Sequence, residues 1–119
     1  MSNNLKKHYL PLYERNTNGE WELKPVFTPD FIPFKTVITA TKMAAKMQKD
    51  TTGEKEIEML EEMMSFVANE IYQGKITTQD LVDKLYAPDA IETLKEQIAF
   101  VSQGYQTKEA KEFVKNFRP

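Results

Sequence analysis

The chain has no cysteine, only four glycines in 119 residues, and a single histidine, His8. The lack of cysteine excludes disulfide bonds and thiolate zinc sites, and a cytoplasmic protein is the simplest interpretation. The scattered glycines form no phosphate-binding loop. A serine–histidine catalytic site could draw only on His8, which we interpret as an exposed strand residue because no second ligand type clusters with it.

An excess of one charge and long apolar runs are also missing. The net charge is −2, with both signs mixed along the chain, which argues against a nucleic-acid partner. No apolar run approaches the roughly 20 residues of a membrane helix, and the polar segment Met1–Lys7 has no signal-peptide character. Glu54, Glu58, Glu61 and Glu62 are expected on the outer face of a helix, where carboxylates are solvated. We therefore expect no catalytic residue, metal, cofactor, small-molecule substrate or membrane partner.

The composition is that of a soluble folded protein, with 40% hydrophobic and 29% charged residues. We expect a single domain over residues 1–119, because this length can bury roughly two-thirds of the unfolded surface. Within it we distinguish an N-terminal strand or arm region (1–29), a helical core (30–104) and a C-terminal helical tail (105–119). The predicted fold class is mainly α, with four to five short-to-medium helices.

The first third of the chain predicts a small β-hairpin or an extended strand arm. Apolar residues alternate around Tyr9–Tyr13 and Trp21–Phe27, and the cluster Asn16–Gly19 between them favours a turn. Pro11 and Pro25 each remove a backbone donor, so the strands should be edge-like. Because two short strands are not stable alone in water, they must lie on the helices or on another subunit.

Capping residues set the expected helix boundaries. Asp30 is expected to cap a first helix that continues to about Gln48. The remaining signals are a capping box of Thr51 and Glu54, a stop at Gly74, a second box of Thr77 and Asp80, a start at Pro88 and Asp89, a stop at Gly104, and a final cap at Thr107. The last helix is short and amphipathic, so it could fray or dock on a neighbour.

The methionines are the most informative side chains. Met43 and Met47 lie four residues apart, as do Met59 and Met63, at the margins of their apolar stripes. Such positions either meet another helix or line a groove for a partner, and methionine suits a groove because its side chain adapts to imperfectly matched surfaces. We predict partner binding by Met43, Met47, Met59, Met63 and Phe66. Met64 falls on the stripe itself, where a role in the core is favoured.

The order of these elements resembles the tail assembly chaperones of long-tailed, non-contractile phages of Gram-positive bacteria. The resemblance covers residues 28–104. Its parts are Thr28-Pro29-Asp30-Phe31-Ile32, a methionine-bearing helix that ends Phe66-Val67-Ala68-Asn69-Glu70-Ile71-Tyr72, the run Ile76-Thr77-Thr78-Gln79-Asp80-Leu81-Val82-Asp83-Lys84-Leu85, and a helix from Leu94 to Gly104. The segment up to Phe27 is more aromatic than the family pattern, and the tail after Gly104 is basic.

This resemblance implies a non-enzymatic protein of the host cytoplasm that is absent from the finished virion. Such chaperones bind and solubilise the long helical tape measure protein until tail tube subunits replace them. Coating a long rod also favours a homo-oligomer, which could be a spiral. Two other classes stay open. A virion structural component, such as a head–tail connector or tail completion protein, would remain in purified particles. A small regulatory or antitoxin-like module would need a basic recognition helix, which is not evident.

Overall fold

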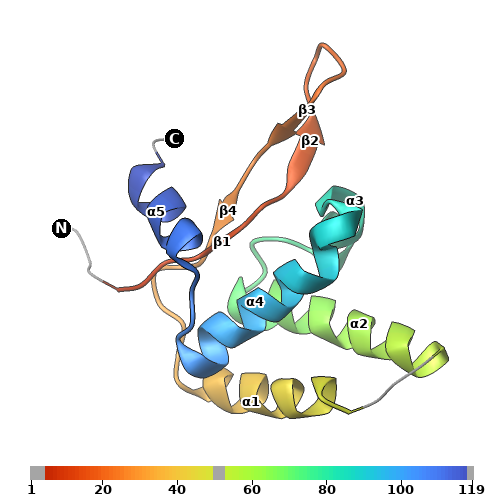
Figure 1. The fold of residues 1–119 in the computed structure, drawn as a ribbon, viewed down its shortest axis with the longest axis vertical. Coiled ribbons are helices and arrows are strands. Elements are labelled where there is room, and N and C mark those ends of the chain that lie inside the picture. The colour runs from red at the N-terminus through yellow and green to blue at the C-terminus, as the bar shows by residue number, and fades with distance from the viewer. Residues whose placement is uncertain (1–4, 50–52, 118–119) are drawn as a thin grey trace.

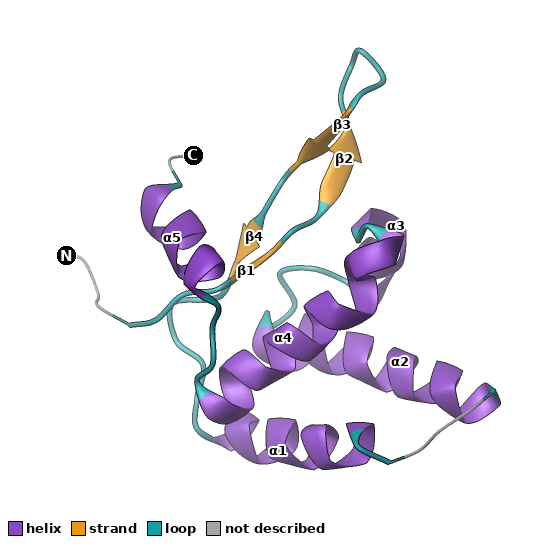
Figure 2. Ribbon diagram, in the orientation of Figure 1, coloured by secondary structure: helices purple, strands orange, loops and turns teal. Residues whose placement is uncertain are grey.

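A layer of crossing helices carries a β-hairpin that projects away from it (Figure 1). The computed structural model describes residues 5–49 and 53–117. The strands are β1 (Tyr9–Leu10), β2 (Tyr13–Arg15), β3 (Trp21–Leu23) and β4 (Val26–Phe27). The helices are α1 (Lys35–Met47), α2 (Glu54–Phe66), the π-helix η1 (Val67–Ile71), α3 (Thr78–Lys84), the 3-10 helix η2 (Ala87–Asp89), α4 (Ala90–Gln103) and α5 (Lys108–Asn116). The mainly α fold with an N-terminal hairpin is confirmed (Figure 2).

The hydrophobic core lies where α1, α2, η1 and α4 meet. α4 supplies Leu94, Ile98 and Val101, which recur every three or four residues and so lie on one face. The π-helix extends α2 and buries Val67, Ala68 and Ile71, followed by the fully buried Tyr72. Gln73 and Gly74 then adopt positive φ and turn the chain away. The predicted stop of this helix at Gly74 is therefore confirmed.

The hairpin is a two-stranded ribbon in two sections. β1 pairs with β4 and β2 pairs with β3, both antiparallel, with Tyr9 opposite Phe27 and Arg15 opposite Trp21. At the turn, the side-chain oxygen of Asn16 accepts hydrogen bonds from the backbone N–H groups of Asn18 and Glu20. The β1–β4 section, called the base below, lies close to the helices; the β2–β3 section, called the tip, projects beyond them.

Buried amides hold the base on the helical layer. The Tyr72 hydroxyl donates to Gln97 Oε1 over 2.6 Å, and Gln97 Nε2 donates to the carbonyl of Tyr9 over 2.8 Å. Gln106 Nε2 donates to the carbonyl of Lys7 over 2.7 Å. These bonds satisfy polar groups that burial would otherwise leave unpaired, so the strand is fixed in one position.

The C-terminal helix packs on the base of the hairpin. The rings of Tyr9 and Phe113 stack with centroids 4.2 Å apart, and Phe27 and Phe117 lie 5.2 Å apart. α5 therefore docks on this chain's own hairpin (Figure 1). Of the two supports expected for the strands, the helices or another subunit, the structure shows the helices of this chain.

Three predicted helix signals are confirmed. Thr77 and Asp80 form a full capping box, Thr107 accepts a hydrogen bond from the backbone of Ala110, and Gly104 ends α4 in the left-handed conformation. α2 begins at Glu54, while Thr51, the other residue of its predicted capping box, lies outside the described residues.

Two predictions are wrong. Asp30 does not cap α1, because its carboxylate pairs with Lys7 Nζ at 2.6 Å and the helix begins at Lys35. His8 is not exposed: it is buried, with its ring 5.0 Å from that of Phe100. Both differences involve a partner that is distant in sequence: Lys7 pairs with Asp30, and Phe100 packs against His8.

Candidate partner-binding site

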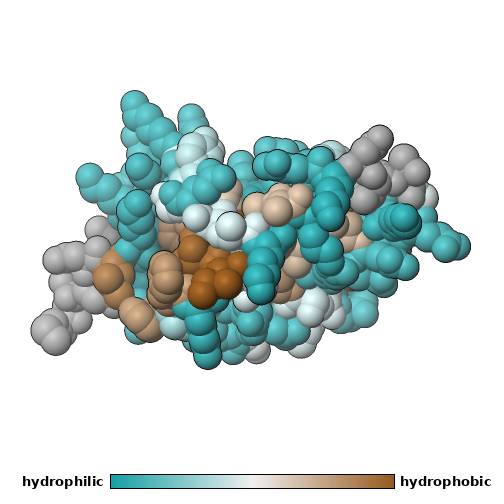
Figure 3. All heavy atoms as spheres, turned by 90° about the horizontal axis from the view of Figure 1, so that it is seen from below, coloured by the Kyte–Doolittle hydropathy of each residue, from teal (hydrophilic) through white to brown (hydrophobic). Residues whose placement is uncertain are grey.

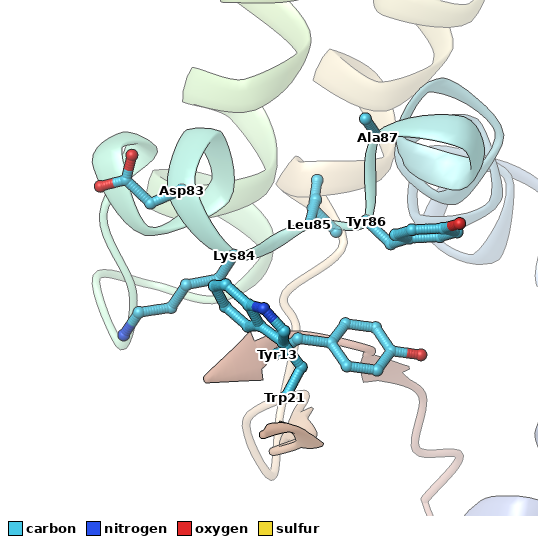
Figure 4. Close-up of a pocket in the computed structure, with 7 residues that line it drawn as sticks. All are labelled: Tyr13, Trp21, Asp83, Lys84, Leu85, Tyr86 and Ala87. Carbon is cyan, nitrogen blue, oxygen red and sulfur yellow. The ribbon is translucent and has the colours of Figure 1, made fainter. Parts of the chain in front are cut away.

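An aromatic cleft separates the tip of the hairpin from the connection between α3 and α4. Its volume is about 440 Å³. The hairpin contributes Tyr13 and Trp21, and the other side is formed by Asp83, Lys84, Leu85, Tyr86 and Ala87 (Figure 4). Asp83 points away from the aromatic rings. The lining is therefore mainly aromatic and aliphatic, as is common where a protein receives an apolar group.

Backbone pairing and an ion pair set the two sides of the cleft. Leu12 and Leu85 form an antiparallel bridge that brings the hairpin to the end of α3. Lys84 Nζ lies 3.2 Å from Glu14 Oε2 and 3.5 Å from Asp80 Oδ1. The hydrogen bond that Lys84 Nζ donates to the Glu14 carboxylate holds the pKa of the Lys84 ammonium above its usual value. Lys84 is thus satisfied within the chain and presents its stem to the cleft (Figure 4).

The aromatic side chains of the cleft are open to solvent. Trp21 is 62% exposed and Tyr86 is 59% exposed. The half-buried Tyr13 lies between the two sides, and the centroid of its ring is 6.4 Å from that of Tyr86. The guanidinium of Arg15 lies 5.6 Å from the centre of the Trp21 ring and helps to orient it. Tryptophan and tyrosine are the residues that most often dominate binding energy at protein interfaces.

The residues predicted from the methionine pattern lie mostly in the core. Met43, Met63 and Phe66 are buried, and Met47 and Met59 are half-buried against the same core. Met43 and Phe66 line a shallow hollow between α1 and α2, whereas Met47 lines a separate depression between α1 and α4. Their binding role stays a prediction. In the arrangement described here, Met63 is 2% exposed, so a partner could reach it only if the helices separated.

The single histidine and the acidic side chains are the groups that metal binding or proton transfer would use. The described residues contain no group of three His, Asp or Glu side chains placed to hold a metal ion. Burial lowers the pKa of His8 to about 4, and its Nδ1 has no hydrogen-bond partner within the described ranges. Across residues 5–49 and 53–117, no helix is both long and apolar enough to cross a membrane.

The aromatic cleft could not be predicted from the sequence. Trp21 and Tyr86 are 65 positions apart, and the bridge between Leu12 and Leu85 that brings their segments together leaves no local signal. The only available sign was the unusual aromatic content of the segment before Phe27, which the fold uses in both the base and the tip of the hairpin.

A comparison with protein families identifies the chain. A family model described as phage tail chaperone protein matches residues 7–116, which include the hairpin, the helical layer and the whole of α5. The chain belongs to this phage tail chaperone family. No curated protein and no solved structure matches the chain significantly. Because the family match includes the N-terminal hairpin, the aromatic cleft lies wholly within the part of this tail chaperone that the family shares.

Proposed function

We propose that this tail chaperone binds the tape measure protein during tail assembly and keeps it soluble until tail tube subunits replace it. The protein would act in the host cytoplasm, leave before the virion is complete, and have no enzymatic activity. Membership of the phage tail chaperone family supports this role, and the open aromatic cleft is the observation that carries it.

The chemistry of the cleft suits a helical apolar partner. An amphipathic helix presents large side chains at intervals of three or four residues, and each needs an apolar recess at the receiving surface. Trp21, Tyr13 and Tyr86 offer such a recess with little conformational entropy to lose, because aromatic side chains have only two rotatable bonds. A weak, repeated contact of this kind would let the chaperone be displaced later by tube subunits.

The methionine positions form a second proposed contact. Met47 and Met59 are half-buried and could extend the apolar contact without unfolding, whereas Met43, Met63 and Phe66 would first have to leave the core. The cleft therefore accounts for binding to the folded protein more simply than the methionine positions do.

Co-expression with the tape measure protein of the same phage genome tests this function. The wild-type chain should keep the tape measure protein soluble and co-purify with it at many copies per chain. The double substitution Trp21→Ala and Tyr86→Ala should remove this co-purification. Tyr105→Ala is a matched control, because Tyr105 is similarly exposed but lies on the linker between α4 and α5.

Analysis of purified virions can give the result that would contradict this function. If the protein is found in them and ignores the tape measure protein in solution, it is a structural component, such as a head–tail connector or tail completion protein. If the cleft variants capture the tape measure protein as well as the wild type does, the tape measure protein binds a surface other than the cleft.

A further inference from the structure

Two apolar surfaces of the molecule differ in what covers them. On the side of α1, Figure 3 shows a hydrophobic patch within a mainly hydrophilic surface, and both Phe34 and Ile38 are exposed to solvent. The base of the hairpin carries a second apolar surface, formed by the rings of Tyr9 and Phe27, and α5 lies over it (Figure 1). At the base, therefore, the structure itself shows which kind of segment the surface receives: a short amphipathic helix.

The C-terminal helix contacts the base through one stripe of side chains. Ala110, Phe113 and Phe117 recur at three and four residues and so lie on one face of the helix. The pairing register places Tyr9 opposite Phe27 across the ribbon, on one face of the hairpin. The two phenylalanine rings of α5, with centroids 5.5 Å apart, lie against this pair, and the four rings form what we call the ring cluster. The base thus receives two aromatic side chains that are one helical turn apart.

Few interactions attach α5 to the base. Across residues 5–49 and 53–117, no hydrogen bond or ion pair joins a residue of α5 to another element. Only Ala110 of its nine residues is buried, and the hydrophobic core of the described residues includes no residue of α5. The linker before the helix adds a polar contact, in which Gln106 donates to the carbonyl of Lys7. Because a helix of this length is marginally stable alone in water, α5 can detach and unfold without opening the core.

We propose that α5 is a displaceable occupant of the base and that a helix of the tape measure protein takes its place there. This proposal rests on the function proposed above, and it defines the occupant: an amphipathic helix with two aromatic or large aliphatic side chains one turn apart, as in Phe113 and Phe117. Because no hydrogen bond or ion pair within the described residues selects α5, the base recognises this apolar spacing and not an exact sequence. A long helical protein offers many segments of that kind.

The C-terminal helix competes with any partner helix for the base. The linker of residues 104–107 keeps α5 close to the ring cluster, so its effective concentration there is high. A tape measure helix binds only the fraction of chains in which α5 has detached, which lowers its apparent affinity by that fraction. α5 also returns when the partner leaves, and so opposes rebinding once tube subunits arrive. The aromatic cleft, in contrast, includes no residue of α5 and is not subject to this competition.

Removal of the two phenylalanine rings tests the competition in the full-length chain. Phe113→Ala with Phe117→Ala should raise the affinity for a tape measure helix about tenfold, because α5 no longer competes for the base. Lys111→Ala with Lys115→Ala, on the exposed side of α5, is the matched control and should bind like the wild type. Titration against a tape measure segment fused to a soluble carrier measures the affinities, and circular dichroism shows whether each variant is folded. The double substitution in the cleft should change the affinity in the opposite direction.

A labelled peptide with the sequence of residues 105–117 tests the base without the tape measure protein. It should bind the variant that lacks both phenylalanines, whose base is free, at least about tenfold more tightly than it binds the wild type, whose own α5 occupies the base. A peptide in which both phenylalanines are replaced by alanine should bind neither protein. Fluorescence anisotropy gives these affinities.

Hydrogen exchange of the wild-type chain tests the displacement without any substitution. Binding of the tape measure segment should speed exchange at the amides of α5, while β1 and β4 stay protected. Capture with unchanged protection of α5, or an affinity of the phenylalanine variant no higher than that of the wild type, would overturn the proposal. A peptide that ignores the free base would do the same. If no form of the chain captures the tape measure protein but the peptide binds, the proposed function and the named occupant fail, and the base remains only as a site for a helix.

Discussion

The base and the tip of the hairpin are built from the same ribbon but have opposite surroundings. At the base, Leu10 is fully buried and Tyr9 lies between Gln97 of α4 and Phe113 of α5. At the tip, Trp21, Glu22 and Leu23 are all exposed. The difference shows that the ribbon has two separate tasks: its base holds the fold together, and its tip holds one side of the aromatic cleft.

The largest expected effect is the loss of packing at the base. Leu10→Ala should lower the free energy of unfolding by about 2–5 kcal/mol, because it leaves a cavity in the hydrophobic core. The matched change at the tip, Leu23→Ala, should cost under about 1 kcal/mol, since Leu23 is already exposed. Chemical denaturation of both variants measures the comparison. Equal losses would show that base and tip support the fold alike.

Low pH should reduce the stability of the fold through His8, which directly precedes β1 at the base of the hairpin. Burial lowers the pKa of His8 to about 4 in the folded chain, against 6.5 when unfolded. Above pH 6.5 the imidazole is neutral in both states and contributes no pH dependence. As the pH falls from 6.5 towards 4, the unfolded chain binds the proton first. Stability should therefore fall by about 2 kcal/mol between pH 7 and pH 5 from this residue.

The variant His8→Phe isolates this effect from that of the carboxylates. It removes the only histidine of the chain, so its stability should vary less with pH than that of the wild type over the same interval. Denaturation at several pH values gives both slopes. Identical slopes would mean that His8 binds protons equally in both states.

Loss of the buried amide should have a smaller effect. Gln97→Leu leaves the Tyr72 hydroxyl and the Tyr9 carbonyl without their partner, at a cost of about 1–3 kcal/mol. Gln103→Leu, on the exposed end of the same helix, is the control and should be nearly neutral. Hydrogen exchange at β1 should report the same difference, and unchanged protection there would contradict the role of Gln97 as the anchor of the base.

The smallest effect on stability is expected at the tip, where the effect on binding should be large. Trp21→Ala should change the free energy of unfolding by no more than about 0.5 kcal/mol, because most of the indole is in solvent. Capture of the tape measure protein should nevertheless weaken. A variant that both unfolds and loses binding would remove the distinction between the two sections of the ribbon.

Local signals in the sequence were good guides to the fold. Thr77 with Asp80, Thr107 and Gly104 act on groups within a few residues, so the helix ends that they mark could be predicted. Asp30 and His8 could not, because Lys7 and Phe100 reach them from distant parts of the chain.

The surfaces were harder to predict for the same reason. Helical spacing gives the angle of a side chain about its axis, but not which neighbour covers that angle. Met63 was predicted to line a groove and is buried, whereas the aromatic Phe34, directly before α1, is 76% exposed. Burial of such a side chain depends on which elements pack against that face of its helix, and no local pattern specifies this.

The hydrogen bonds of the base also bear on synthesis. Gln97, Gln106 and Phe113 fix β1 and the residues just before it, so this early strand depends on segments that leave the ribosome between 88 and 104 residues later. Until then Leu10 and Tyr9 have no covering helix. The hairpin can form early but gains its support last, and the nascent chain must stay soluble through its charged helices in the interval.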